Sequence, residues 1–229
     1  MLPSGTEKQR YVERMFDDIA PRYDFMNRLM TFGIDRSWRK ATIKAARIDR
    51  DSVVADIGCG SGDLCVDAAD TGATMIGIDP SHGMLELARR RAPAAHLLRT
   101  VGEALPLGDA TCTAVVSGFA LRNWSSVPAV IAEARRVLKP GGRIAILEID
   151  VPERAALRAG FNIYFRRIVP LLGSVLSSTS AYQYLADSLA YLPSNAELHA
   201  MLDEYGFEDI NKTRLSGGIA QLITATRSK

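Results

Sequence analysis

Short hydrophobic runs alternate with helical patterns between Asp51 and Glu148 of the 229-residue chain. Buried strands of a parallel sheet are nearly continuous apolar runs, whereas helices that cover a sheet repeat apolar residues every three or four positions. The runs predict strands at Val53–Ile57, Met75–Asp79, His96–Val101, Cys112–Ser117 and Arg143–Glu148. The helical spacings predict helices at Gly62–Ala69, Met84–Arg91 and Val127–Leu138. This alternation predicts an α/β fold, with a mostly parallel sheet and helices on both faces.

Further segments flank this core on both sides. Residues 7–46 are mostly helical in pattern, and residues 153–192 carry apolar residues at helical spacing. A helix near Ala196–Glu204 and strands at Phe207–Arg214 and Ile219–Thr226 follow. We expect one domain with four parts: an N-terminal helical cap (1–50), a core (51–150), a helical insertion (151–193) and a C-terminal helix and strand pair (194–229).

Composition and charge exclude several classes of protein. With 47% hydrophobic and 24% charged residues, the chain resembles an ordinary globular protein. The net charge of +2 and the scattered basic residues argue against a nucleic-acid partner. The three cysteines have no metal-ligand spacing and predict neither a disulfide framework nor a metal site. No signal peptide and no apolar run of about 18 residues is present, so we expect a cytoplasmic protein, either free or peripheral on the inner face of the membrane.

A glycine-rich stretch, DIGCGSGD at 56–63, directly follows the first predicted strand. Without side chains at Gly58, Gly60 and Gly62, the backbone can turn sharply and approach a ligand closely. The dinucleotide fingerprint has its third glycine five positions after the first, where this chain has Asp63. A nucleotide-binding oxidoreductase is therefore disfavoured.

The spacing GxGxG after an acid is instead typical of a site for S-adenosyl-L-methionine. No pyrophosphate has to be neutralised there, so the carboxylate of Asp56 can face the ammonium group of the methionine moiety. Asp79 ends the second predicted strand, where a carboxylate can accept hydrogen bonds from both ribose hydroxyls. An ordinary turn between a strand and a helix is the alternative for the loop, and a helix cap is the alternative for Asp79.

Several longer motifs resemble those of known methyltransferases. RVLKPGGRIAILE at 136–148 is similar to the element before the fifth strand of class I S-adenosylmethionine-dependent methyltransferases. YDFMNRLMTFGIDRSW at 23–38, FALRN at 119–123, YQYLADSL at 182–189 and LSGGIAQL at 215–222 resemble the ubiquinone/menaquinone biosynthesis C-methyltransferase family. This resemblance spans about residues 11–226.

The resemblance implies both a fold and an activity. The fold would be Rossmann-like, with a seven-stranded, mostly parallel sheet and an antiparallel C-terminal strand. The cofactor would be S-adenosyl-L-methionine. The activity would be C-methylation of a prenylated hydroquinone ring, that of demethylmenaquinol or the ubiquinol precursor, so the small-molecule partner would be hydrophobic and quinol-like.

The resemblance also assigns cofactor contacts, which fall on Ser61, Asp79, Val101 with Gly102, and Ser117. The family usually has Asn or Asp at the position of Val101, where a side chain can bind the adenine amino group. Here only the backbone N–H of Gly102 is left to meet a ring nitrogen. The alternative function is that of a related methyltransferase with another phenolic, prenyl or small-metabolite acceptor.

Arg122 and Asn123 follow the fourth predicted strand at its carboxyl end, where parallel sheets bind ligands. A hydroquinone carbon becomes nucleophilic when its neighbouring hydroxyl loses a proton, and a fixed guanidinium can stabilise that oxyanion. Asn123 can hold the second ring oxygen, and Tyr23 or Asp24 can act in proton transfer. The alternatives are that Arg122 pairs with an acid and fixes a loop, and that the protein is a non-catalytic subunit.

Residues 154–176 combine large apolar side chains with arginines such as Arg154 and Arg158. This pattern fits an interfacial helix pair that meets a prenyl tail or a bilayer, with the arginines near lipid phosphates. A helical cap packed on the sheet and a contact between two copies in a homodimer fit it equally well.

Overall fold

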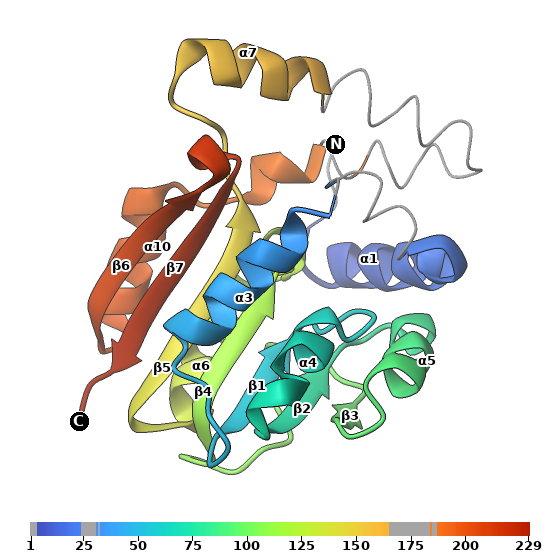
Figure 1. Ribbon diagram of the computed structural model, residues 1–229, viewed down its shortest axis with the longest axis vertical. Helices are drawn as coiled ribbons and strands as arrows, with labels where there is room; N and C mark the ends of the chain where they lie inside the picture. The colour runs from blue at the N-terminus through green and yellow to red at the C-terminus, as the bar shows by residue number, and fades with distance from the viewer. Residues whose placement is uncertain (1–3, 24–30, 32, 165–183, 185–186) are drawn as a thin grey trace.

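A seven-stranded sheet forms the centre of the computed structural model, which describes residues 4–23, 31, 33–164, 184 and 187–229 (Figure 1). The strands are β1 (Val53–Ile57), β2 (Thr74–Ile78), β3 (His96–Leu98), β4 (Cys112–Gly118), β5 (Leu138–Ile149), β6 (Phe207–Leu215) and β7 (Ala220–Arg227). Their order is β3-β2-β1-β4-β5-β7-β6, and β7 alone runs antiparallel to its neighbours β5 and β6. The predicted fold class is confirmed.

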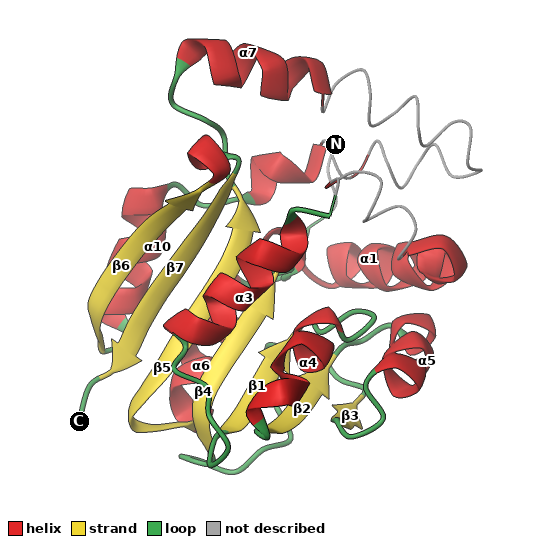
Figure 2. Ribbon diagram, in the orientation of Figure 1, coloured by secondary structure: helices red, strands yellow, loops and turns green. Residues whose placement is uncertain are grey.

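Helices cover both faces of this sheet (Figure 2). The α-helices are α1 (Gly5–Ile19), α3 (Asp35–Ala45), α4 (Asp63–Ala68), α5 (His82–Arg91), α6 (Val127–Val137), α7 (Ala155–Ile163) and α10 (Asn195–Glu204). The short 3-10 helices are η1 (Ala20–Arg22), η2 (Ala69–Thr71), η3 (Leu121–Asn123), η5 (Ser188–Tyr191) and η6 (Ser216–Gly218). Figure 2 shows α3 and α4 on one face of the sheet, with α6 and α10 on the other.

Successive strand residues point to opposite faces, so each strand supplies two hydrophobic cores. Val54 and Val116 pack with residues of α3 and α4. Their neighbours Ala55 and Val115 pack with residues of α6 and α10 on the other face. The central strands are apolar at nearly every position because both of their faces are covered.

Serine side chains fix the starts of three helices. The hydroxyls of Ser81 and Ser126 accept hydrogen bonds from backbone N–H groups three residues later, at the starts of α5 and α6. At the start of α10, Ser194 and Glu197 form a capping box, in which each side chain accepts from the other residue's backbone N–H. Ser126, one of the two serines available to cap the predicted helix at Val127–Leu138, is thus its N-cap.

Two strands, β3 and β5, differ from their predicted length by more than two residues. β3 ends at Leu98 rather than Val101, because its ladder with β2 stops at the pair Ile78–Leu98 and closes with a hydrogen bond from the Asp79 N–H to the carbonyl oxygen of Leu98. β5 begins at Leu138 rather than Arg143, because Leu138 already pairs with Cys112 before an irregularity in the ladder. Hydrophobic pattern cannot show such pairing, which depends on the neighbouring strand.

Two helices lie beyond the carboxyl ends of the parallel strands. Figure 1 shows α1 and α7 there, with α1 beside α5. The crossover after β1 leads to β2 on one side, and the crossover after β4 leads to β5 on the other, which places a ligand-binding switch point between β1 and β4 at this edge. Most of the helical pattern predicted after residue 164 lies outside the described residues.

Candidate active site

The glycine loop after β1 leaves space for a ligand. Gly58 and Gly60 both have positive φ angles, +75° and +53°. A Cβ atom on Gly58 would lie only 2.4 Å from the Cβ of Ala120, so no larger residue fits there. A Cβ on Gly60 would meet nothing within 4 Å, because this residue faces open space. The backbone at Gly60 can therefore be approached directly by a bound molecule.

Two adjoining cavities flank this loop, with volumes of about 80 Å³ and about 500 Å³. Asp79, Val101 and Gly102 line the smaller cavity, whereas Asp56 and Ser61 line the larger one. The residues that line both are Phe16, Tyr23, Gly58, Gly60, Gly118, Phe119 and Asn123. A molecule of two linked parts can thus extend from one cavity into the other past these shared residues.

Asp79 is held firmly at the tip of β2. Its Oδ2 accepts a hydrogen bond from the backbone N–H of Gly60 at 2.9 Å, and its Oδ1 accepts from that of Ser81 at 2.9 Å. Burial raises the pKa of Asp79 to about 6, although these two hydrogen bonds oppose the shift. The carboxylate lies beside Val101 and Gly102 in the smaller cavity, as expected of a site for a ribose and an adenine.

Asp56 carries an oxygen atom without a partner. Its side chain is 1% exposed, and Oδ2 accepts a hydrogen bond from the Sγ of Cys65 at 3.6 Å. Oδ1 is buried and has no hydrogen-bond partner among the described residues. Burial raises the pKa of this carboxyl to about 7. An ammonium group in the larger cavity would satisfy Oδ1, so these residues fit the methionine end of the cofactor expected from the sequence.

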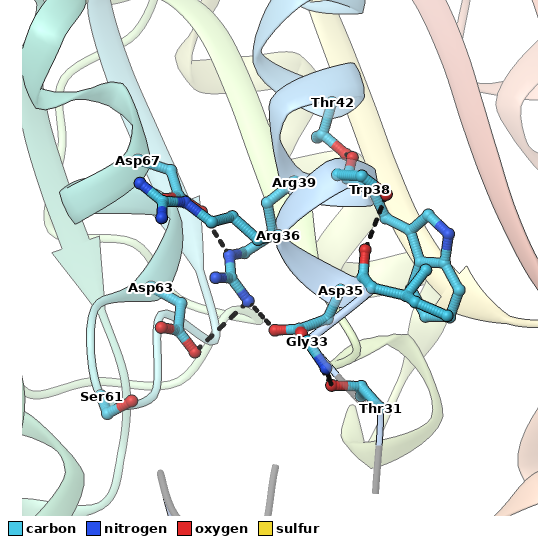
Figure 3. Close-up of polar contacts among 12 residues, drawn as sticks. Thr31, Gly33, Asp35, Arg36, Trp38, Arg39, Thr42, Ser61, Asp63 and Asp67 are labelled. Atoms are coloured by element: carbon cyan, nitrogen blue, oxygen red, sulfur yellow. Dashed lines mark hydrogen bonds and ion pairs between the residues drawn. The ribbon is translucent and has the colours of Figure 1, made fainter. Parts of the chain in front are cut away.

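Arginines from two helices hold the glycine loop. Arg91 of α5 donates to the Oγ of Ser61 at 2.5 Å and pairs with Oδ1 of Asp63 at 2.6 Å. Figure 3 shows Arg39 of α3 among Asp63, Asp35 and Asp67. Its Nη1 pairs with Asp35 and lies 3.8 Å from Oδ2 of Asp63, and its Nε donates to Asp67 at 2.5 Å. Neither arginine was predicted as a site residue, because nothing in the local sequence pattern marks them.

The structure does not bring two of the expected cofactor residues into either cavity lining. Ser117 is 1% exposed, and its hydroxyl donates to the carbonyl oxygen of Ile57 at 2.7 Å, which links β4 to β1. Gly62 begins α4, and a Cβ there would lie 3.2 Å from the Cβ of Ala88 on α5. Both residues contribute to packing in this structure.

Arg122 lies in η3 and lines the larger cavity, although only 5% of it is exposed. Its Nη1 donates to the carboxylate of Glu148 and to the carbonyl oxygen of Phe119, the latter at 3.0 Å. The Glu148 side chain at the end of β5 has no exposure at all. Arg122 Nε is buried and finds no hydrogen-bond acceptor in the described part of the chain. The guanidinium therefore forms an ion pair with an acid, which was the structural alternative. It also lines the cavity, which a catalytic role requires.

Asn123 and Tyr23 lie where the cavities meet, and both line each of them. Asn123 Oδ1 accepts a hydrogen bond from the hydroxyl of Tyr184 at 3.3 Å. Burial raises the pKa of Tyr184, so this phenol stays protonated and can donate. Asp24, the other candidate for proton transfer, lies outside the described residues.

Helix α1 covers the cavities and is fastened near both of its ends. Near its start, the Nζ of buried Lys8 donates to the carbonyl oxygen of Trp124 at 2.7 Å and lies 3.8 Å from the ring centroid of Tyr191. Burial lowers the pKa of Lys8 to about 8.

The second anchor lies near the end of α1. Oδ1 of Asp17 accepts hydrogen bonds from the Ser81 hydroxyl at 2.6 Å and from the backbone N–H of Gly83 at 2.9 Å. Neither role was apparent from the sequence.

The LSGG motif also borders the larger cavity, at the same edge of the sheet beside the end of β5. Ser216 lines the cavity and accepts a hydrogen bond at 2.9 Å from Nε1 of Trp38, which also lines it. Trp38 packs against Phe119, with 6.1 Å between the ring centroids. Two of the motifs that lie outside the common sheet therefore meet at this cavity.

Comparison with known families and proteins agrees with this geometry. Residues 4–227 match the model of the ubiE/COQ5 methyltransferase family. The chain is 38% identical to the ubiquinone/menaquinone biosynthesis C-methyltransferase UbiE of Geotalea uraniireducens, over 97% of this chain and 98% of the relative. It is 35% identical to the demethylmenaquinone methyltransferase of Roseiflexus castenholzii, over 99% of this chain and 98% of that protein.

Solved structures show the same fold at lower sequence identity. An S-adenosylmethionine-dependent methyltransferase from Thermotoga maritima matches with a TM-score of 0.67 and 19% identity. The match covers 95% of this chain and all of the other. The arrangement of strands and helices is thus shared beyond the closer relatives.

Replacing Asp56 by Asn removes a carboxyl that burial keeps protonated. Burial raises its pKa from the ordinary 3.8 to about 7, so the folded state binds more protons than the unfolded state and loses stability as the pH rises between these values. We expect Asp56→Asn to raise the free energy of unfolding at about pH 8 by up to about 4 kcal/mol. Urea denaturation at about pH 8 and about pH 4 measures this, and an equal effect at both would contradict it.

Removing Arg122 leaves the buried carboxylate of Glu148 without its partner. We expect Arg122→Ala to lower the free energy of unfolding by about 3–5 kcal/mol, and Arg122→Met with Glu148→Leu to recover most of it. The control is Arg214→Ala, which breaks an exposed pair with Glu153 and should cost less than about 1 kcal/mol. Equal losses from Arg122→Ala and Arg214→Ala in urea denaturation would show that burial of the first pair is unimportant.

Proposed function

The chain belongs to the ubiE/COQ5 methyltransferase family, and we propose that its two cavities hold the methyl donor and a prenylated hydroquinone. It is an S-adenosyl-L-methionine-dependent methyltransferase that acts on carbon in quinone biosynthesis. The observation that carries the proposed placement is the pair of carboxyls at neighbouring strand ends, Asp56 and Asp79. They lie in different cavities on either side of the open backbone at Gly60.

We propose that the adenosine part occupies the smaller cavity and the methionine part enters the larger one. Asp79 would accept hydrogen bonds from the ribose, while Val101 and Gly102 would lie against the adenine. Asp56 would bind the ammonium group through its unpartnered oxygen, and Ser61 would lie beside the same end of the cofactor. When bound, the cofactor supplies an electrophilic methyl group on a sulfonium.

The chain's own residues must then make the acceptor ring nucleophilic. Phenolic hydroxyls have pKa values of about 10, so the site has to favour the phenolate as the new bond forms. Arg122 would donate hydrogen bonds to the developing oxyanion, with Glu148 fixing the guanidinium in place. Asn123 would hold the second ring oxygen, since its side chain is fixed by Tyr184. Correct placement of the ring relative to the methyl group supplies much of the remaining rate enhancement.

The proton of the ring hydroxyl needs an acceptor at the same site. Tyr23 lines both cavities, and Asp24 is its neighbour in the chain. We propose that one of these two groups accepts the proton directly or through water.

The test of this function is transfer of a labelled methyl group to two acceptors, reduced demethylmenaquinone and the reduced ubiquinone precursor. We expect one or both to be methylated. We further expect Asn123→Ala to lower kcat by about 10- to 100-fold while the affinity for S-adenosylmethionine changes little, because Asn123 acts on the acceptor.

Asn211→Ala is the matched control, since Asn211 is an exposed residue of β6 outside both cavities. Its kcat should equal that of the unchanged protein. Methylation of neither quinol, together with turnover of another phenol or small metabolite, would refute the proposed acceptor and leave the methyltransferase activity standing.

We also propose that α7 rests on a membrane surface. Within the described residues, no helix combines the length and hydropathy needed to cross a bilayer. Yet Val151, Leu157 and Ile163 are exposed large apolar side chains, and Arg154 and Arg158 are exposed beside them. Apolar side chains flanked by arginines are typical of helices that bind the boundary between headgroups and acyl chains.

This position of α7 would also suit a substrate that carries a prenyl tail. Leu157, Phe161 and Tyr164 line the larger cavity, so α7 borders both the cavity and the outside of the protein. A tail that leaves the cavity beside α7 would pass directly into the bilayer. A second copy of the chain on the same surface is the alternative.

Co-sedimentation with phosphatidylcholine–phosphatidylglycerol vesicles tests the membrane contact. We expect Ile163→Glu to weaken binding to the vesicles roughly tenfold or more. The variant removes an apolar side chain that would enter the bilayer, and it adds a negative charge that anionic lipid repels. The control is Ile210→Glu, which makes the same substitution at a partly buried residue of β6 and should leave vesicle binding unchanged. Unchanged binding of Ile163→Glu, or a concentration-dependent dimer lost in that variant without lipid, would favour the alternative.

A further inference from the structure

Three aromatic side chains lie where the two cavities meet. Phe16 of α1, Tyr23 after η1 and Phe119 after β4 each line both cavities. The rings of Phe16 and Tyr23 pack edge to face, with centroids 6.0 Å apart and an angle of 69° between their planes. Segments that are far apart in the chain thus place aromatic rings around one junction.

Phe119 is held there in a strained conformation. Its φ angle is +59°, in the left-handed region that bulky residues rarely adopt. Its N–H donates to the carbonyl oxygen of Leu147 at 2.8 Å, and its own carbonyl oxygen accepts from Arg122 at 3.0 Å. Strained residues persist where the surrounding contacts determine them, and they gather at functional sites. The position of this ring is therefore imposed by the buried Arg122–Glu148 pair and the end of β5.

No ionised side chain is found among the described residues that line both cavities. Asp79 lines only the smaller cavity and Asp56 only the larger one. A donor whose adenosine and methionine parts occupy different cavities has its sulfonium between them, at this junction. Its positive charge would then meet aromatic rings and not a carboxylate.

We propose that Phe16, Tyr23 and Phe119 form an aromatic cage that binds the sulfonium charge and so distinguishes the methyl donor from its demethylated product. This inference rests on the proposed placement of the cofactor. Aromatic faces carry negative electrostatic potential and attract onium ions, most strongly where water is excluded. The cage holds the donor while the charge is present.

The distinction follows from the electron balance of the transfer. The ring carbon of the acceptor supplies the electron pair of the new C–C bond, and the pair of the broken C–S bond stays on sulfur. The sulfur becomes a neutral thioether. The methylated carbon then loses its proton to water as the ring regains its aromaticity, and the base returns the hydroxyl proton to the ring oxygen. The cage keeps its packing contacts with the product but loses the charge that it attracts, which favours product release.

Binding measurements separate the cage from ordinary packing. Isothermal titration gives the Kd of S-adenosylmethionine and of S-adenosylhomocysteine for the unchanged protein, Phe16→Leu, Tyr23→Leu and Phe119→Leu. We expect each leucine variant to raise the Kd of the charged donor about 3- to 30-fold more than that of the neutral product. Equal weakening of both ligands would show that the rings only pack, and would overturn the inference.

Two further variants serve as controls. Tyr23→Phe keeps the ring and removes the hydroxyl, so it should preserve the ratio of the two Kd values. Tyr205→Leu removes an aromatic ring at the end of α10, outside both cavities, and should also leave the ratio unchanged. Because Phe119→Leu changes a strained position and can unfold the protein, Phe16→Leu and Tyr23→Leu decide the question if that variant loses its cooperative melting transition.

Failure of the cage and failure of the proposed function give different results. If neither ligand binds the unchanged protein, the placement of the cofactor is wrong. If both bind and the ratio of their Kd values stays constant through Phe16→Leu and Tyr23→Leu, the placement stands and the cage is refuted.

Discussion

Parallel hydrogen bonding makes β1, β2, β4 and β5 end at one edge of the sheet. The glycine loop, Asp79 and Asn123 depend on this alignment, because each of them follows a different strand at that edge. Gly60 follows β1, Asp79 follows β2 and Asn123 follows β4, and they meet although about 20 to 60 residues separate them in the chain. The crossovers after β1 and β4 lead to opposite sides, which leaves a crevice between the loops that follow these two strands.

The same edge holds two carboxyls that the protein interior disfavours. Glu148 is fully buried, and the guanidinium of Arg122 compensates its charge. Asp56 is nearly as buried, but no cation faces its second oxygen among the described residues, and burial raises its pKa to about 7. An ammonium group of the cofactor would compensate the charge of Asp56, as the guanidinium of Arg122 compensates that of Glu148. One carboxyl is therefore satisfied within the protein, whereas the other keeps one oxygen without a partner among the described residues.

The N-terminal helix completes a site that the sheet alone leaves open. Lys8 ties α1 to the loop that carries Asn123, and Asp17 ties it to the loop that follows Asp79. Phe16 lies between these two anchors, on the same helix. The same helix thus contacts the loops that carry Asn123 and Asp79 and contributes Phe16 to the junction of the two cavities.

The sequence by itself determined the central strands, the glycine loop and the acid at the end of β2. These features depend on neighbours in the chain: continuous apolar runs for buried strands, glycine where φ is positive, and serine at helix starts. It also indicated that Arg122 is either paired or catalytic. It could not identify Glu148 as the partner, because 26 residues separate them and nothing local to either one records the contact.

The tertiary structure decided the rest. It turned Ser117 towards Ile57 and Gly62 towards α5, away from the cavities, and it ended β3 where β2 ended. It also recruited Arg39, Arg91 and Lys8, whose surroundings in sequence are those of ordinary surface residues. The physical reason is that burial, ion pairing and strand partners are set by distance in space, and segments remote in the chain supply them.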